Sequence, residues 1–228
     1  MKKVIETKNL NKTFGEGDLL VQALNNVSIE ITEGEFTALV GPSGSGKTTL
    51  LNMIGGLDDP NSGKVILNGQ DISTLKKSKM TNFRQHNIGF VFQAYNLIPV
   101  LSAYENAEFI MLLQGISKSE RKKRVFKLLK EVGLEGKENN KPGELSGGQQ
   151  QRVAVVRALA AEPAYILADE PTANLDSKST TDLLDLMYRL NQEEHMTFVF
   201  ATHDQRVIDR AKRVIYLDDG KIVKDEIR

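Results

Sequence analysis

The feature that most constrains the fold of this chain is the octapeptide at residues 41–48, with the sequence GPSGSGKT. An apolar run at residues 36–40 precedes it and a helix-forming run at residues 49–54 follows, which gives the order strand, glycine loop, helix. The pattern G-x-x-x-x-G-K-[ST] in that context is a phosphate-binding P-loop. Glycine lets consecutive backbone N–H groups turn toward phosphate oxygens, and the N-terminal end of the helix points at the same anion. The octapeptide therefore predicts a nucleotide site in an α/β fold, with Lys47 on the β- and γ-phosphates and the Thr48 hydroxyl on Mg²⁺.

Composition excludes several classes of protein. The 228 residues include no cysteine, which excludes disulfides and cysteine-ligated zinc. Lys+Arg and Asp+Glu are balanced at 30 each, so no overall positive field attracts nucleic acid. No apolar run approaches the ~18 residues that a membrane-spanning helix needs, and residues 1–6 contain no apolar signal core. We therefore expect a protein that is neither secreted nor membrane-spanning, and that serves a membrane only through a partner.

Strand and helix patterns divide the chain into two sheet-forming ends and a helical middle. The pattern is helical from Tyr95 to about Ala161, with capping boxes that begin at Ser117 and Ser146, and again at residues 177–192. Turns are expected at Asn25-Asn26 and Glu33-Gly34. Strands, including hairpins closed at Asn68-Gly69 and Asp219-Gly220, are expected at residues 4–10, 23–31, 36–40, 64–68, 88–92, 165–170, 197–201 and 214–223.

Two adjacent carboxylates, Asp169 and Glu170, end an apolar strand. The carboxyl end of a central strand is where α/β sheets bind ligands. In a P-loop protein the first acid holds Mg²⁺, directly or through water, and the second is free to polarise the attacking water. The alternative is an exposed strand end that happens to carry two acids. His203 also ends a core strand, and Asp204 after it is expected to cap a short helix. His86 and His195 lie in polar surroundings and are expected at the surface.

Two further features admit both a structural and a functional interpretation. Ser146 and Gln149 form a capping box, which by itself explains a well-capped helix start. The two glycines between them are costly in a first helical turn, and they make sense if a large anion approaches the backbone there. Phe14, at a strand end, is equally consistent with a half-buried strand residue and with a platform on which an adenine ring stacks.

Taken together, these segments resemble an ABC-transporter ATPase subunit over essentially the whole chain. Residues 145–149 (LSGGQ) match the family's signature motif in full, and residues 166–172 (ILADEPT) match Walker B. Residues 174–176 (NLD) look like the D-loop, while the Q-loop, switch-histidine and adenine-stacking positions fall on Gln93, His203 and Phe14. The departures are Phe14 for the usual Tyr and Ala173 for a residue that is often Gly or Ser, and neither casts doubt on ATP binding.

The resemblance implies the fold and its division. It implies an α/β P-loop NTPase of ABC type, with a RecA-like core, an antiparallel β subdomain and an α-helical signature subdomain. Residues 1–228 form a single ABC ATPase domain in this interpretation. About 1–93 and 162–228 form the β subdomain and the catalytic core, and about 94–161 form the helical subdomain that carries the signature motif.

The resemblance also implies a site shared between two copies of the chain, with ATP and Mg²⁺ bound in it. The catalytic residues are expected to be Glu170, as base or water-orienter, His203, which contacts the γ-phosphate, and Gln93. Asp176 belongs to the D-loop. Mg²⁺ is held by Thr48 and Gln93, with Asp169 acting through water. The second copy covers the nucleotide with Ser146, Gly147, Gly148 and Gln149. The residues expected to bind ATP are Phe14, Gly41, Pro42, Ser43, Gly44, Ser45, Gly46, Lys47, Thr48 and Thr49.

A finer resemblance is to the lipoprotein-releasing (LolD-like) and macrolide-efflux (MacB-like) ATPases, carried by residues 15–22, 56–58, 92–99 and 168–176. It implies a homodimer in the ATP-bound state and an integral-membrane permease as partner, with the chain peripheral on the cytoplasmic face of the cell membrane. Contact with nucleic acid or with the exported cargo is not expected.

Two other functions compete with this interpretation. The first is a soluble ABC ATPase acting on nucleic acid or ribosomes. Such relatives usually carry two ATPase units, a long coiled-coil insertion or cysteine-ligated zinc, and this chain has none of these. The second is a nucleotide-dependent scaffold that does not hydrolyse ATP. The presence of both Glu170 and His203 argues against it.

Overall fold

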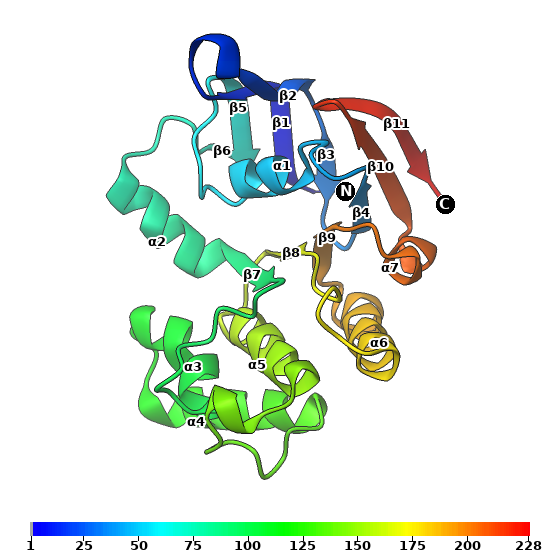
Figure 1. The fold of residues 1–228 in the computed structure, drawn as a ribbon. Helices are drawn as coiled ribbons and strands as arrows, with labels where there is room; N and C mark the ends of the chain where they lie inside the picture. The colour runs from blue at the N-terminus through cyan, green and yellow to red at the C-terminus, as the bar shows by residue number, and fades with distance from the viewer. Residues whose placement is uncertain (1) are drawn as a thin grey trace.

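The computed structural model describes residues 2–228, without the side chain of Asp18. A six-stranded sheet forms its centre, in the order β11-β10-β4-β9-β8-β7 (Figure 1). The five strands from β10 to β7 are parallel, and β11 pairs antiparallel with β10 at one edge. The strands are β4 (Phe36–Val40), β7 (Ile88–Phe92), β8 (Tyr165–Asp169), β9 (Thr197–Ala201), β10 (Arg213–Asp218) and β11 (Lys221–Ile227).

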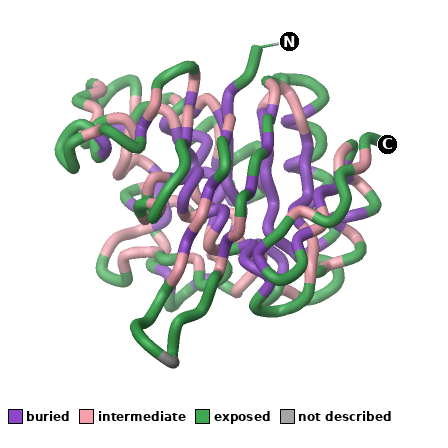
Figure 2. The backbone as a smooth tube through the Cα atoms, turned by 90° about the horizontal axis from the view of Figure 1, so that it is seen from above, coloured by how far each residue is buried: buried purple, intermediate pink, exposed green. Residues whose placement is uncertain are grey.

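The central strands are apolar on both faces because the sheet is covered on both sides. Successive side chains of a strand point to opposite faces, so Tyr165 and Leu167 join one buried cluster and Ile166 and Ala168 join another. The first cluster lies against α1 (Lys47–Ile54), the antiparallel strands and the helix at Lys77–Asn87, and the second lies against the helices that follow β7 in the chain. Buried residues accordingly run along the middle of the molecule (Figure 2).

A second, antiparallel sheet is built mainly from the N-terminal third. Its order is β2-β1-β5-β6, and β3 pairs with β1 outside that path. The sequence predicted one strand at residues 23–31 and a turn at Asn25-Asn26. The turn was wrong, because Asn26 takes φ +55° and forms a bulge within β2. The predicted strand forms but is interrupted at residues 28–29, after which β3 begins. The strands are β1 (Lys3–Phe14), β2 (Val21–Val27), β3 (Glu30–Thr32), β5 (Ser62–Leu67) and β6 (Gln70–Asp71), with a 3₁₀ turn η1 at Gly17–Leu19.

Three helices, α3 to α5, pack on one another away from the antiparallel sheet (Figure 1). The helical pattern expected from Tyr95 begins only at Ala103, because Tyr95 and Asn96 adopt positive φ and Ser102 caps the first helix with a capping box. The helices beyond α1 are α2 (Lys77–Asn87), α3 (Ala103–Leu113), α4 (Lys118–Glu131), α5 (Gly147–Ala160), α6 (Ser177–Glu194) and α7 (Gln205–Arg210), with a 3₁₀ turn η2 at Pro142–Glu144.

The hairpin of β10 and β11 supports the loop between β4 and α1. Its turn, Asp219-Gly220, has positive φ at both residues, as predicted for a two-residue hairpin turn. The Gly220 N–H donates to the Ser45 carbonyl at 3.1 Å, and the Gly220 carbonyl accepts from the Asn25 N–H at 2.8 Å. The closing hairpin thus ties the glycine loop to the antiparallel sheet. Among residues 2–228, no helix combines the length and the apolar character required to cross a bilayer.

Candidate functional site

The loop between β4 and α1 folds around its own lysine. Lys47 is almost wholly buried, and its Nζ donates to the Gly41 carbonyl at 2.8 Å and to the Pro42 carbonyl at 2.9 Å. Gly46 has φ +101°, and a Cβ at that position would lie 2.4 Å from the Ala23 carbonyl oxygen. Only glycine satisfies both conditions. The loop therefore holds a positive charge at the N-terminal end of α1, where phosphate is also favoured by the helix dipole.

A cavity of about 590 Å³ opens above this loop. That volume is within the range of pockets that enclose small-molecule ligands. Four other segments join the loop there: strand β2 and the residues that follow β7, β8 and β9. The lining consists of Val21, Ala23, Gly41, Pro42, Ser43, Gly44, Gly46, Lys47, Thr48, Thr49, Gln93, Glu170, Ala173 and His203.

Asp169 does not line this cavity itself, but it contacts Thr48, which does. The Thr48 hydroxyl donates to Asp169 Oδ1 at 3.0 Å, so the end of β8 meets the first turn of α1. Burial raises the pKa of the Asp169 carboxyl and the neighbouring Glu170 adds to the rise, against the hydrogen bond from Thr48 and the charge of Lys47. A cation placed beside Asp169 would favour its ionised form.

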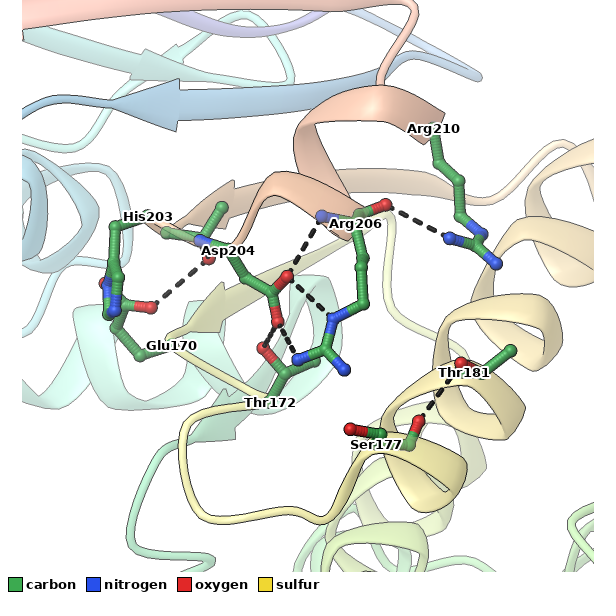
Figure 3. A network of polar contacts seen from close by, with 9 residues as sticks. Glu170, Thr172, Ser177, Thr181, His203, Asp204, Arg206 and Arg210 are labelled. Atoms are coloured by element: carbon green, nitrogen blue, oxygen red, sulfur yellow. Dashed lines mark hydrogen bonds and ion pairs between the residues drawn. The ribbon is translucent and has the colours of Figure 1, made fainter.

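Glu170 occupies a strained backbone position. Its φ is +44°, which costs a residue other than glycine roughly 1–3 kcal/mol. Its N–H donates to the Ala201 carbonyl at 2.9 Å, and its Oε2 accepts from the Thr202 hydroxyl at 3.2 Å. Its Oε1 lies 2.7 Å from Nδ1 of His203, and the two side chains face one another (Figure 3). Strain of this kind concentrates at functional sites, where neighbouring contacts hold it.

Gln93 and the segment that contains Asp176 are connected to each other. The Asn174 side chain donates from Nδ2 to the Gln93 carbonyl at 3.0 Å. Asp176 caps α6, and its two carboxylate oxygens accept from the backbone N–H and the hydroxyl of Ser179 at 2.9 and 2.6 Å. These hydrogen bonds lower the pKa of the Asp176 carboxyl. Asp176 does not line the cavity in this chain.

The signature residues begin α5 at a different place in the chain. Ser146 and Gln149 form the predicted capping box, with reciprocal hydrogen bonds of 3.3 and 3.0 Å. None of residues 146–149 lines the cavity. Packing also favours glycine at position 148, which the sequence did not indicate. A Cβ on Gly148 would lie 2.6 Å from the Ser179 hydroxyl oxygen. The start of α5 is therefore packed closely against the start of α6.

Phe14 is half exposed at the end of β1, and its ring is not among the residues that line the cavity. The ammonium group of Lys12 lies 4.9 Å from the ring centroid. Val21, which pairs with Phe14 across the sheet, does line the cavity. The structure thus places Phe14 next to the cavity wall, and its role in stacking on adenine stays a prediction.

Sequence reasoning missed Thr202, Asp204 as more than a helix cap, and Thr172. The Thr202 hydroxyl bonds Glu170 and accepts from the Asp204 N–H at 3.0 Å. Thr172 donates from its hydroxyl to Asp204 Oδ2 at 2.9 Å. The only available signal was position: each residue lies within two places of Glu170 or His203 in the sequence.

The residues predicted to hold Mg²⁺ form a compatible set of donors. A hydroxyl from Thr48, a carboxylate from Asp169 and the side chain of Gln93 at the cavity wall offer hard oxygen ligands, which Mg²⁺ prefers. Thr48 and Asp169 are in contact, so two of the three donors lie together.

Comparisons with known proteins agree with this geometry. The family model described as "ABC transporter" matches residues 24–173. An ABC transporter ATP-binding protein of Thermotoga maritima, described as uncharacterized, is 46% identical over 97% of this chain and 94% of its own length. The macrolide export ATP-binding/permease protein MacB of Hyphomonas neptunium is 48% identical over 97% of this chain, which spans 34% of that relative.

Solved structures support the same assignment. The ATP-binding cassette MJ0796, in a dimeric post-hydrolysis state bound to ADP and Pi, superposes with a TM-score of 0.91 at 45% identity and covers 98% of both chains. The protein of that name comes from Methanocaldococcus jannaschii. These matches confirm the family and the fold class predicted from the motifs. The chain therefore belongs to the ABC transporter family, as one of its ATP-binding ATPase cassettes.

Proposed function

We propose that this chain binds and hydrolyses ATP as the motor subunit of an ABC transporter complex, and that it works as a homodimer on a membrane permease. The observation that carries the proposal is one cavity in which the glycine loop, Gln93 and the Glu170–His203 pair meet. A cavity with a buried cation, a metal-compatible donor set and a paired carboxylate has the parts that phosphoryl transfer to water needs.

In this proposal, residues 41–49 bind the phosphates through the loop backbone and Lys47. Thr48 and Gln93, with Asp169 acting through water, would hold Mg²⁺, and the bound ion would neutralise charge on the phosphate oxygens. Glu170 orients the attacking water and polarises it at Oε1 or Oε2, while His203 contacts the γ-phosphate. The contact between His203 and Glu170 keeps both groups at the same side of the cavity.

The signature residues are proposed to complete the site of a second copy. Ser146 to Gln149 begin α5, in the helical part of the chain at about residues 94–161, and are absent from this chain's own cavity. Free N–H groups at a helix start bind anions well, and the solved relative is a dimer. Two chains in head-to-tail arrangement would each cover the other's ATP. Hydrolysis removes the charge that bridges them, so that the pair opens.

The permease is proposed to dock beside Gln93. A groove of about 440 Å³ runs between β7 and α3, and Phe90 and Phe92 stack there at 5.4 Å between ring centroids. Apolar side chains dominate its wall, and the two arginines in it, Arg84 and Arg157, donate to backbone carbonyls of this chain. An amphipathic segment of a permease fits such a surface. MacB relatives are named as ATP-binding and permease proteins in one chain, which supports a permease as the occupant.

This proposal places the chain at the cytoplasmic face of the cell membrane, held there by its permease. It also assigns no contact with nucleic acid or cargo, since formal charges cancel and the groove is largely apolar. The lipoprotein-releasing and macrolide-efflux type remains the proposed subfamily. A soluble ATPase acting on nucleic acid or ribosomes has no supporting observation.

Glu170→Gln tests the catalytic part of the proposal. The amide keeps the size of the side chain and its acceptor for Thr202 but cannot act as a base. We expect ATP affinity within twofold of wild type and turnover reduced at least ~100-fold. The matched control is Glu193→Gln, on the exposed face of α6, which should hydrolyse normally. Turnover at the wild-type rate in Glu170→Gln would contradict the role given to Glu170.

Ser146→Arg tests the shared site. The variant loses its helix cap and adds bulk where the second copy would lie, so ATP binding should persist while ATP-induced dimerisation disappears from gel filtration. Ser117→Arg is the control, because Ser117 caps α4 with the same kind of hydrogen bond. Each change should cost about 1 kcal/mol of stability. An unchanged ATP-induced dimer in Ser146→Arg would remove the shared site from the proposal.

A further inference from the structure

The loops that follow β8 and β9 are joined at two places. The first is the contact of Glu170 with Thr202 and His203. The second lies two residues further along the chain from Glu170, where the Thr172 hydroxyl donates to Asp204 Oδ2 at 2.9 Å. Figure 3 shows Thr172 and Glu170 approaching the segment of residues 203–204 from the neighbouring loop. Thr172 is 3% exposed, so water does not compete for this hydrogen bond.

Asp204 is a rigid acceptor for Thr172. Its Oδ1 accepts from the backbone N–H and from Nε of Arg206, both at 2.9 Å, and its Oδ2 accepts from Nη2 at 2.7 Å. Arg206 is in turn tied to Arg210, whose Nη1 donates to the Arg206 carbonyl at 3.1 Å. Four hydrogen bonds from two residues therefore converge on one carboxylate, and the start of α7 cannot shift without moving Thr172.

Thr172 lies two residues after Glu170, so its hydrogen bond to Asp204 also restrains the backbone at Glu170. Glu170 has φ +44°, and a left-handed residue of this type relaxes to negative φ unless both flanks are held. On its N-terminal side β8 is fixed in the sheet. On its C-terminal side the chain is held by Thr172 and by Gln151, whose Nε2 donates to the Pro171 carbonyl at 2.8 Å.

We propose that Thr172 and Asp204 form a clamp that holds Glu170 in the orientation needed to position the attacking water. Thr172 is a positioning residue in this proposal: it does not touch the nucleotide, and it acts through Glu170. The proposal rests on the function proposed above for Glu170. The clamp works by hydrogen bonding, so the hydroxyl of Thr172 matters and its methyl group does not.

Thr172→Val and Thr172→Ser separate the hydroxyl from the shape of the side chain. Valine keeps the branched shape, and Asp204 Oδ2 retains its bond to Arg206, so no buried acceptor is left unpaired. We expect Thr172→Val to lower kcat roughly tenfold with KM for ATP within twofold, and Thr172→Ser to restore kcat to within twofold of wild type. Rates are divided by the concentration of ATP-binding sites, so that a loss of folded protein does not register as a loss of kcat.

A second arm tests whether Thr172 acts through Glu170. In a Glu170→Gln background, the change Thr172→Val should not lower the residual rate further; an additional tenfold loss there would overturn the clamp. An unchanged kcat in Thr172→Val, with Glu170→Gln inactive, would overturn the clamp and leave the proposed function standing. A normal rate in Glu170→Gln would instead refute the proposed function. If the valine variant does not fold, Thr172→Ala replaces it with the same expected loss of kcat.

Discussion

Gly46→Ala is expected to be much more damaging than Gly44→Ala, although both positions lie in the same loop and both have positive φ. Gly46 has φ +101°, and its added Cβ would lie 2.4 Å from the Ala23 carbonyl oxygen and 3.1 Å from a Leu24 methyl group. Gly44 has φ +80° with no atom within 4 Å of an added Cβ. The two variants therefore share the conformational cost and differ in the steric cost.

The magnitude follows from these two terms. A left-handed conformation costs an alanine about 1 kcal/mol, and the clash at Gly46 adds about 1–3 kcal/mol because strand β2 must move to relieve it. We expect Gly46→Ala to lose about 3 kcal/mol of unfolding free energy and roughly 10 °C in melting temperature, and Gly44→Ala about 1 kcal/mol and roughly 3 °C.

The assay is thermal and urea unfolding, followed by circular dichroism, with no nucleotide present. Nucleotide is omitted because Gly44 faces the cavity, where an added methyl group would also weaken phosphate binding and confuse the comparison. Equal destabilisation by the two substitutions would refute the reasoning, since it would show that the Ala23 carbonyl does not constrain the loop.

Two further predictions concern charge and metal. Bonding to Arg206 lowers the pKa of Asp204 from 3.8 to about 2, so its carboxylate stabilises the fold above pH 4 and loses that contribution as the pH falls toward 2. Asp204→Asn keeps the helix cap but loses the charge. In urea unfolding we expect it to be less stable than wild type by about 1 kcal/mol at pH 6, after allowance for the partly exposed Arg206, and by less at pH 3. A loss of stability that does not change with pH would contradict the assignment. Thr48→Val removes the hydroxyl that bonds Asp169, so titration with ATP should show unchanged binding in EDTA and no gain on addition of Mg²⁺; a wild-type gain would exclude Thr48 as a ligand.

Local features were predictable from the sequence because they depend on neighbouring residues. The glycine loop is encoded within eight residues and the caps at Ser146 and Asp204 within four, and the structure has all three. The carboxyl ends of β8 and β9 likewise followed from apolar runs that stop at polar residues. Parallel strands then bring Glu170 and His203 to the same edge, where they meet.

Contacts between distant segments were not predictable, because no local pattern records them. Thr172 and Asp204 are separated by 32 residues, and nothing in either segment specifies that their side chains bond. The contact of Gly148 with Ser179 was not predictable either, because it depends on how α5 packs against α6 in the tertiary structure. The bulge at Asn26 was missed because an Asn pair favours a turn locally, whereas pairing with β1 keeps the strand running.

The position of β4 has a consequence for how the chain comes into being on the ribosome. β4 leads directly into the phosphate loop, yet its neighbours in the sheet are β9 and β10, and the hairpin turn at Gly220 supports the loop from behind. Residues 41–48 leave the ribosome long before these neighbours, since synthesis proceeds from the N-terminus. A nascent chain that stops short of residue 197 carries the sequence of the phosphate loop without the walls that shape it. We therefore expect nucleotide affinity to arise late, when the last strands enter the sheet, so that the growing chain does not bind ATP or form a closed pair before then.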